Sequence, residues 1–301
     1  MDRRPFLKNL SLGASLSLLS SNQLFSGIYS NENFELNYAP HLGMFENSAG
    51  SDIMDQIYFM SDMGFKSFED NTMKSRNLST QNKISKALQN KEMSMGVFVA
   101  HRIYWDKPNL TSGDPGYQEE FLKDIKDSVE VAKRVNAKWM TVVPGLLDQR
   151  KNLSYQTANV IETLKKASDI LEPHNLVMVL EPLNFRDHPG LFLSRSPQAY
   201  QICKSVNSPS CKILFDIYHQ QIQEGNLIPN IESCWDQIGY FQIGDNPGRK
   251  EPLTGEINYR NVFKFIKDQN YTGILGMEHG NSIPGIEGEK ALIEAYRAVD
   301  S

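Results

Sequence analysis

The stretch ILFDIYH (residues 213–219) joins a short apolar run to a carboxylate and an imidazole. Residues 213–215 are uninterrupted hydrophobic positions, a pattern typical of a parallel β-strand that is covered on both faces. Asp216 ends this run abruptly, and His219 follows it three residues later. If other strands of the chain end in the same way, their polar side chains would meet at one end of a sheet.

Apolar runs of this kind alternate with segments of helical periodicity along the chain. The predicted strands cover residues 34–43, 65–71, 94–101, 138–145, 176–184, 211–219, 239–245 and 273–280. The predicted helices cover residues 52–64, 79–93, 117–137, 155–175, 196–207, 226–238, 258–271 and 287–300. Gly64 is the expected end of the first helix, and Ser79 or Thr80 is the expected N-cap of the second. This alternation predicts an α/β fold, namely a single-domain (β/α)8 TIM barrel over residues 31–301. An open doubly wound sheet is the alternative, but residues 39–50 lack the G-x-G-x-x-G loop that such a sheet carries after its first strand.

The composition is that of an acidic globular protein. The chain has 301 residues, of which 40% are hydrophobic, and a formal net charge of -5. No block of Lys or Arg interrupts it, so binding to nucleic acid or to an anionic membrane is disfavoured. The three cysteines, Cys203, Cys211 and Cys234, have no zinc-site spacing, and we expect them to be buried small hydrophobic residues.

The N-terminus has a different character. Residues 2–21 read DRRPFLKNLSLGASLSLLSS, with Arg3 and Arg4 ahead of a modest apolar run that is too short and too polar to span a bilayer. This order resembles a twin-arginine export signal. We therefore expect residues 1–30 to be an export signal and linker, and the mature protein to be periplasmic. If the signal does not function, the protein would be cytoplasmic.

Oxygen-bearing side chains stand at the ends of four consecutive predicted strands: Glu181, Asp216, Gln242 and Glu278. In a (β/α)8 barrel the carboxyl ends of the strands form the active-site face, so these four residues should converge. Carboxylates that converge repel one another unless a cation lies among them. An all-oxygen ligand set suits Mg²⁺ or Mn²⁺ better than Zn²⁺, so we expect one divalent ion of that kind as cofactor.

Four segments carry a resemblance to a known family. They are LEPLN (residues 180–184), FDIYHQQIQEGNL (215–227), FQIGDNPGRKEPLTGEINYRNVF (241–263) and MEHG (277–280). They resemble the hydroxypyruvate isomerase family, within the xylose isomerase-like (β/α)8 superfamily, and the resemblance is weaker before about residue 180. The block NPGRKEPLTGEINY is the most specific part. The resemblance places the metal ligands on the four strand-end residues.

The resemblance also implies a reaction. Glu181 and Glu278 fall on the family's two acid/base glutamates, which would make this chain an aldose–ketose isomerase, an intramolecular oxidoreductase. One glutamate would remove a carbon-bound proton and a second carboxyl group would return one to the neighbouring carbon, through an enediolate that the metal stabilises. The substrate would be a small hydroxy-oxo acid or a sugar.

Four further residues are candidates for substrate binding. His219 follows Asp216 where the predicted strand turns into its loop, and a matching histidine of the superfamily contacts substrate. Arg249 could bind a substrate carboxylate through its planar guanidinium. Glu69 could bond His219 or a substrate hydroxyl, and His101 could line the pocket.

Two loops frame these candidates. Lys250 and Glu256 are expected to order the loop after the seventh strand, or an interface. Arg186, Asp187 and His188 crowd the loop after the fifth strand and could change the substrate. They leave the reaction class intact and put hydroxypyruvate itself in doubt.

Three other functions are weighed against this one. A sugar 3-epimerase, or another enzyme of keto-sugars, would use the same groups on a different carbon. A phosphodiester-cleaving barrel related to apurinic endonucleases would favour more histidine ligands and a basic groove, which the acidic composition opposes. A non-catalytic binding protein would not need both Glu181 and Glu278. The expected partner is a small molecule, without nucleic acid or a stable membrane span, and homo-oligomer formation is left open.

Overall fold

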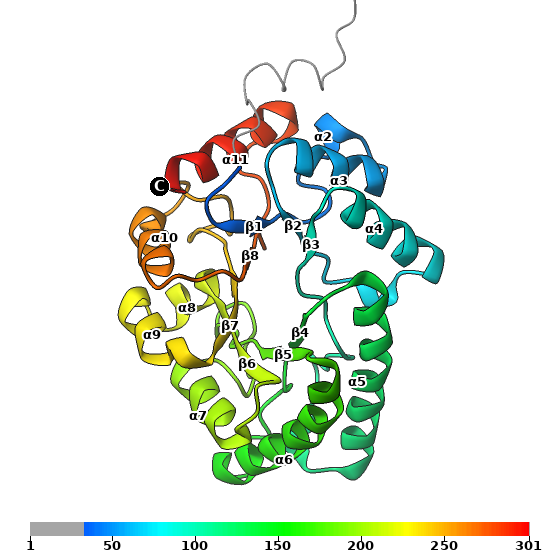
Figure 1. The fold of residues 1–301 in the computed structure, drawn as a ribbon. Helices are drawn as coiled ribbons and strands as arrows, with labels where there is room; N and C mark the ends of the chain where they lie inside the picture. Colours follow the sequence, from blue (N-terminus) through cyan, green and yellow to red (C-terminus); the bar gives the residue numbers. More distant parts are fainter. Residues whose placement is uncertain (1–32, 301) are drawn as a thin grey trace, which may run out of the picture.

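The computed structural model describes residues 33–300, and Figure 1 shows strands at the centre with helices around them. The strands are β1 (Asn37–Ala39), β2 (Ser67–Phe68), β3 (Ser94–Met95), β4 (Trp139–Val142), β5 (Val177–Leu180), β6 (Cys211–Asp216), β7 (Ile238–Gln242) and β8 (Ile274–Gly276). The α-helices are α2 (Glu46–Ala49), α3 (Ile53–Asp62), α4 (Leu78–Asn90), α5 (Pro115–Val135), α6 (Leu153–Leu171), α7 (Ser196–Val206), α8 (Ile217–Gln223), α9 (Leu227–Cys234), α10 (Tyr259–Asp268) and α11 (Gly285–Val299). The predicted export signal lies outside the described residues and stays a prediction.

The strands are parallel and follow a TIM-barrel-like order. Six of them form one sheet in the order β1-β8-β7-β6-β5-β4, and β2 pairs separately with β3. Isolated parallel bridges join the two sheets: His41 pairs with Glu69 on one side, and on the other Met95 pairs with Ala137 and Val99 with Thr141. The carboxyl ends of neighbouring strands therefore lie at one end of the ring, as the alternation of strands and helices predicts.

The strands are buried on both faces because the core has two layers. Along β5, Val177 and Val179 belong to a small apolar cluster that includes Leu214 and is made almost entirely of strand residues from around the ring. The alternate residues Met178 and Leu180 belong to the larger cluster that the surrounding helices share. Side chains of a strand alternate between its faces, so one set fills the barrel and the other packs under the helices. This arrangement explains the uninterrupted apolar runs of the sequence.

Several predicted boundaries differ from those of the structure, and two of these differences have the same physical cause. Helix α4 has Asn77 as its N-cap rather than Ser79 or Thr80, and the Asn77 side chain accepts a hydrogen bond of 2.8 Å from the backbone N–H of Thr80. Strand β6 ends at Asp216 and not at His219, because the Asp216 carboxylate accepts backbone N–H groups of the next residues and starts α8. A helix begins next to the side chain that caps it, and this residue need not lie where the sequence changes from polar to apolar.

Two further features of the described residues are the absence of a membrane-spanning helix and the state of the cysteines. Within residues 33–300, no helix is both long enough and apolar enough to cross a membrane. The three cysteines are free and buried, which confirms their expected role as core residues.

Candidate active site

The four predicted ligands come from neighbouring strands at the active-site end of the ring. Asp216 pairs in register with Gln242 across β6 and β7, and Gln242 pairs with Gly276 across β7 and β8. Glu181 follows directly on β5, and Glu278 lies two residues beyond the end of β8. The barrel topology thus places four oxygen-bearing side chains around one end of the sheet.

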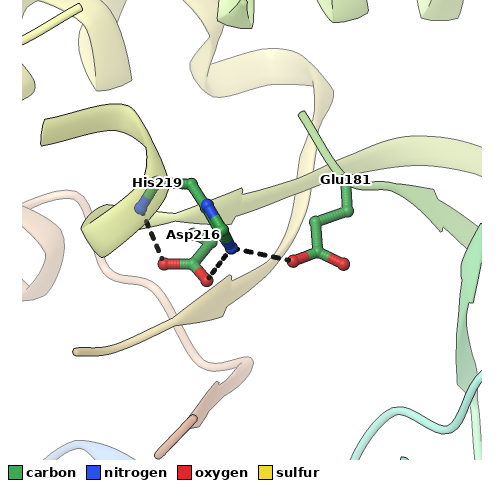
Figure 2. Close-up of side chains that lie close together, drawn as sticks. All are labelled: Glu181, Asp216 and His219. Atoms are coloured by element: carbon green, nitrogen blue, oxygen red, sulfur yellow. Dashed lines mark hydrogen bonds and ion pairs between the residues drawn. The ribbon is translucent and has the colours of Figure 1, made fainter. Parts of the chain in front are cut away.

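Figure 2 shows three side chains pointing toward one another: Glu181 directly after β5, Asp216 at the end of β6 and His219 on α8. The His219 Nε2 atom lies 3.6 Å from an Asp216 carboxylate oxygen and 4.0 Å from one of Glu181. One potential ligand atom from each residue lies within 4.8 Å of the others, and all three residues are buried. The sequence predicted His219 near this cluster as a substrate-binding residue and did not include it among the metal ligands.

Arg249 joins the two sides of the site. Its guanidinium Nη2 lies 2.9 Å from the Asp216 carboxylate and 2.8 Å from the Glu278 carboxylate. Burial alone would lower the pKa of Arg249, but the nearby carboxylates, Glu278 first among them, raise it above the ordinary value. The guanidinium therefore stays charged, and its buried Nε–H has no acceptor among residues 33–300. The expected role in binding a substrate carboxylate stays a prediction.

The loop that carries Arg249 is held in place by hydrogen bonds within it. The Asp245 carboxylate accepts from the backbone N–H groups of Gly255 and Ile257, at 2.9 and 3.1 Å. The Glu256 carboxylate accepts from the Asn246 amide at 2.7 Å, in line with the expected role of Glu256 in ordering this loop. These contacts fix the loop over the barrel end.

Burial raises the pKa of two carboxyl groups of the site. Burial, and then the negative charges of Glu278 and Asp216, raise the pKa of Glu181 well above its ordinary value. Burial also raises the pKa of Glu278 to about 7, although Arg249 opposes the shift. A carboxyl group whose pKa lies near neutrality can both accept and donate a proton under ordinary conditions.

Gln242 offers a carbonyl oxygen to the site. Its amide Nε2 donates to the Glu69 carboxylate at 2.7 Å, which fixes the orientation of the amide. Its Oε1 is buried and accepts no hydrogen bond within the described part of the chain. An orphaned buried acceptor beside convergent carboxylates is what a hard divalent cation would complete, so the residues fit Mg²⁺ or Mn²⁺.

Glu69 holds Gln242 through a hydrogen bond, whereas the sequence suggested His219 as its partner. It is fully buried and accepts hydrogen bonds from Tyr240 at 2.5 Å, Gln242 at 2.7 Å and His41 at 2.8 Å. Gly276 makes room for this carboxylate, since a Cβ atom there would collide with it. Glu69 therefore orients Gln242, and a contact with substrate stays a prediction.

His101 forms hydrogen bonds to the backbone through both ring nitrogens. Its Nδ1 lies 2.9 Å from the Arg102 carbonyl oxygen, and its Nε2 accepts from the backbone N–H of Val143 at 3.2 Å. Burial lowers its pKa to about 4, so the ring is neutral. With both ring nitrogens bonded to backbone, His101 links the ends of two strands. The role of His101 in binding substrate stays a prediction.

Asn184 determines which nitrogen of His219 carries the proton. The Asn184 Oδ1 accepts from the backbone N–H groups of Arg186 and Asp187, at 3.0 and 2.9 Å. Its Nδ2 must then face the other way, where it lies 2.7 Å from the His219 Nδ1. The backbone N–H of Asn184 points to the same nitrogen, at 3.3 Å.

His219 is therefore a hydrogen-bond donor at the site. Two N–H groups on Nδ1 leave that nitrogen unprotonated, so Nε2 carries the hydrogen in the neutral ring. Burial lowers the pKa of His219 to about 4, and its Nε2 is buried without a partner among residues 33–300. A protonated Nε2 cannot coordinate a cation, but it can donate to a substrate oxygen. No signal in the periodicity of the sequence singles out Asn184, although it lies within the LEPLN motif.

Asn184→Asp is expected to move the His219 proton from Nε2 to Nδ1. The variant keeps the oxygen that caps Arg186 and Asp187 and replaces the donor that faces Nδ1 by an acceptor. Nitrogen-15 NMR of histidine-labelled protein should show this exchange of protonated and unprotonated signals. Loss of a donor to a charged oxygen should lower kcat/KM by about 10- to 100-fold. Asn152→Asp, at the exposed N-cap of α6, is the matched control; unchanged ring signals in Asn184→Asp would contradict the assignment.

These groups surround a cavity of about 180 Å³. Glu181, His219, Arg249 and Glu278 form its polar side, whereas residues such as Ile103, Trp105, Val143 and Leu183 form an apolar side. His188 lies between Trp105 and His219. The centroid of its ring is 5.2 Å from that of the Trp105 ring and 5.4 Å from that of the His219 ring. The sequence indicated the loop that holds His188, but it did not indicate Trp105.

Known proteins of similar sequence belong with this chain in one family. The family described as xylose isomerase-like TIM barrel matches residues 57–299. Hydroxypyruvate isomerase of Escherichia coli is 32% identical over 194 residues, which are 61% of this chain and 75% of that protein. The 2-oxo-tetronate isomerase of Cupriavidus necator is 32% identical over 165 residues, which are 55% of this chain and 64% of that protein. The chain thus spans three quarters of the first relative and slightly less than two thirds of the second.

Solved structures show the same fold at lower identity. An AP endonuclease, family 2, from Brucella melitensis superposes with a TM-score of 0.74 at 24% identity, over 87% of this chain and 99% of that one. The apo form of 3-keto-D-glucoside 4-epimerase from E. coli gives a TM-score of 0.71 at 18% identity, over 88% of this chain and 99% of that one. At these identities the likeness concerns the fold alone.

Proposed function

Because this chain belongs to the xylose isomerase-like TIM barrel family, we propose that it is a metal-dependent isomerase that interconverts a hydroxyaldehyde and a hydroxyketone through an enediolate. The relatives of similar sequence are isomerases, and the chain is an enzyme of that kind. The observation that carries the finer proposal is the convergence of Glu181 and Glu278 at one cavity.

The residues proposed to hold the cation are Glu181, Asp216, Gln242 and Glu278. Their support is the strand register and the orphaned oxygen of Gln242. When bound, a divalent cation supplies positive charge that stabilises negative charge on the substrate oxygens. We propose Mg²⁺ or Mn²⁺ because the ligand atoms are all oxygens.

The two glutamates are proposed to move the proton. One carboxylate removes a proton from the carbon next to the carbonyl group, and the electron pair of that C–H bond becomes the C=C bond of the enediolate. The second carboxyl group then returns a proton to the neighbouring carbon. The former carbonyl oxygen gains a proton, and the hydroxyl group on the first carbon loses one as its oxygen forms the new C=O bond. One proton leaves carbon and one returns, one leaves oxygen and one returns, and the carbonyl group has changed places. Glu181 and Glu278 line the same cavity, so both can face the carbons of one bound substrate.

His219 and Arg249 are proposed to orient the substrate. The Nε2–H of His219 is buried beside Glu181 and can donate to the oxygen that becomes negative. Arg249 lines the same cavity and keeps its Nε–H without an acceptor among the described residues. Donors that are fixed before the reaction stabilise developing negative charge without reorganisation.

A sugar epimerase is the second candidate. Two acids at one cavity could also remove a proton from one face of a carbon and return it to the opposite face of the same carbon. The apolar side of the cavity, with Trp105 stacked on His188, favours a substrate with some apolar surface, as a sugar ring has. The choice between the candidates depends on which carbon gains the proton.

Incubation of the metal-loaded protein in D₂O tests both candidates. With a panel of three- to six-carbon hydroxy-oxo acids and sugars, an isomerase should give aldose–ketose interconversion with deuterium on the neighbouring carbon. An epimerase should give an inverted centre with deuterium on that centre. Chelation of the metal should abolish either result. Turnover without any deuterium in the product would contradict proton transfer through an enediolate.

A further inference from the structure

A second cavity lies at the end of the barrel opposite the proposed active site. This amino-end cavity has a volume of about 410 Å³, and its lining residues stand near the beginnings of strands β4 to β8. It shares no residue with the inner cavity, the one of about 180 Å³ that Glu181 and Glu278 line. Pockets for small molecules measure about 300–1,000 Å³, so the amino-end cavity is large enough for one.

A glycine leaves space at this end of the barrel interior. Val179 and Leu214 belong to the apolar cluster that fills the barrel, and Trp139 packs against that cluster. A Cβ atom on Gly239 would lie 2.8 Å from the Lys212 Cβ and 3.2 Å from the Val179 Cγ1. Gly239 and Lys212 therefore face the barrel interior beside Val179. Because Gly239 lines the cavity without a side chain, the stem of Lys212 can enter there.

Two lysines bring positive charge to the amino-end cavity. The Lys212 Nζ lies 3.2 Å from the Asp236 backbone carbonyl oxygen and 3.1 Å from the Gln237 Oε1, and both of these acceptors are neutral. The Lys138 Nζ lies 5.0 Å from the centre of the Trp139 ring and forms no ion pair within residues 33–300. An ammonium group has three N–H donors, so both lysines keep donors for a ligand.

The carboxylates near the amino-end cavity are paired with other cations. The lining residues, all in the described part of the chain, include no aspartate or glutamate. Asp236 follows a lining residue, and its carboxylate lies 3.2 Å from the Lys204 Nζ. Asp268 precedes the lining residue Gln269, and its carboxylate lies 2.7 Å from the Lys264 Nζ. Lys138 and Lys212 therefore leave the cavity with a positive charge that the protein does not neutralise.

The helix ends at this side of the barrel weaken the positive charge only in part. Helices α5, α7 and α10 end a few residues before lining residues, and the negative end of a helix dipole opposes an anion. Each of these helices has basic residues in its last turn, which counteract the dipole: Lys133 and Arg134 in α5, Lys204 in α7 and Lys267 in α10. The balance at the cavity therefore favours a negatively charged ligand.

Aromatic rings form a fixed wall of the amino-end cavity. The ring centroids of Trp235 and Tyr271 are 6.0 Å apart, and both side chains are partly buried. Phe241 packs against both rings, at 6.2 and 5.1 Å, and the Tyr271 hydroxyl donates to the Ile274 carbonyl oxygen at 3.1 Å. Gly273 makes room for the Tyr271 ring, since a Cβ atom there would collide with it. Rings fixed in this way need no further ordering when a flat ligand packs against them.

We propose that the amino-end cavity is a second ligand site, which binds a small aromatic anion. Its ring packs against the aromatic wall and Trp139, and its negative charge lies beside Lys138 and Lys212. A neutral aromatic molecule would leave the two lysines without a counter-charge, and an aliphatic anion would leave the aromatic wall uncovered. The inference is independent of the proposed function, because the two cavities have no residue in common.

Binding of indole-3-acetate to the whole protein tests the proposal. The chain has three tryptophans: Trp139 and Trp235 line the amino-end cavity, and Trp105 lines the inner cavity. Nitrogen-15 labelling of tryptophan gives a side-chain NMR signal for each, and Trp139→Phe and Trp235→Phe assign two of them. Indole-3-acetate should shift both of these signals saturably, with a Kd of about 1 mM or tighter for a ligand of this size. The Trp105 signal should stay in place.

Two matched compounds separate the contribution of the charge from that of the ring. Indole-3-acetamide keeps the ring and lacks the charge, whereas cyclohexylacetate keeps the charge and lacks the flat ring. Each should bind at least about fivefold more weakly than indole-3-acetate, since each lacks one of the two complementary features. Binding of indole-3-acetate should also weaken as salt is raised, because exposed charges are screened.

Lysine variants locate the charge. Lys138→Met and Lys212→Met keep the stem of the side chain and remove its charge, and each should weaken binding of indole-3-acetate about five- to tenfold. Binding of indole-3-acetamide should change by less than about twofold on the same scale. Lys138 is exposed, so its replacement leaves the core intact. Lys91→Met is the matched control, because the Lys91 Nζ also lies over an aromatic ring, 5.6 Å from the centre of that of Tyr58, but does not line the cavity.

Three results would overturn the proposal. The first is equal affinity for indole-3-acetate and its amide, which would remove the role of the lysines. The second is a shift confined to the Trp105 signal, which would place the ligand at the inner cavity. The third is the same affinity in Lys138→Met and Lys212→Met as in Lys91→Met.

Discussion

Glu278→Gln and Glu181→Gln should each lower kcat/KM by about 10²- to 10⁴-fold, the range of a general acid–base contribution. Glutamine keeps the length of the side chain and one oxygen for the cation, but it can neither take nor return a proton at neutral pH. Both side chains line the inner cavity, and burial is the first cause of the raised pKa in each. Steady-state kinetics with the substrate that the deuterium screen identifies gives the measurement.

The control separates proton transfer from cation binding. Metal analysis of Glu181→Gln should still give about one ion per chain, since a carbonyl oxygen replaces a carboxylate oxygen in the ligand set. Glu130→Gln, at a position on α5 whose side chain is 64% exposed, should leave the kinetics unchanged. Near-full activity of either active-site variant with its ion bound would show that the two-glutamate mechanism is wrong.

The arrangement of the fold could be predicted from the sequence because parallel strands leave a distinct pattern. Both faces of β5 are buried, one in the barrel and one under the helices, so its sequence is an unbroken apolar run. The end of β6 could not be predicted in this way. Asp216 bonds the N–H groups of Tyr218 and His219, and this short-range capping starts α8 where hydrophobicity alone would continue the strand.

The strand-end residues of the site could also be predicted, since topology alone brings the carboxyl ends of parallel strands together. The side-chain bonds between them could not. Arg249 reaches both Asp216 and Glu278 only because buried Asp245 holds the loop that carries it. Glu69 can accept a hydrogen bond from Gln242 because Gly276 has no side chain to fill the space of the Glu69 carboxylate. Such contacts depend on the path of a loop and on the absence of a side chain at a glycine. The hydrophobic periodicity of a sequence contains no information about either.

Asp216→Asn should abolish the stabilisation of the fold by Mg²⁺ or Mn²⁺. In the unchanged protein, free ion at a hundred times its Kd should raise the free energy of unfolding by about 2.7 kcal/mol. The Asp216 Oδ1 caps α8, and its Oδ2 faces the Arg249 guanidinium. Asparagine can keep the capping oxygen, but it places an amide NH₂ where the second carboxylate oxygen and its charge lie now. Cation affinity should therefore fall while the helix cap stays in place.

Thermal unfolding with and without added ion measures this difference, and metal analysis after dialysis provides a second reading. Asp245→Asn is an unsuitable control because that carboxylate holds the Arg249 loop. Asp52→Asn is suitable, since Asp52 caps α3 in the same manner at an exposed position far along the chain from the site. Asp52→Asn should keep the full ion-dependent shift, and Asp216→Asn should show none. An equal shift in both variants would mean that the cation binds elsewhere, and the ligand set of Glu181, Asp216, Gln242 and Glu278 would then be wrong.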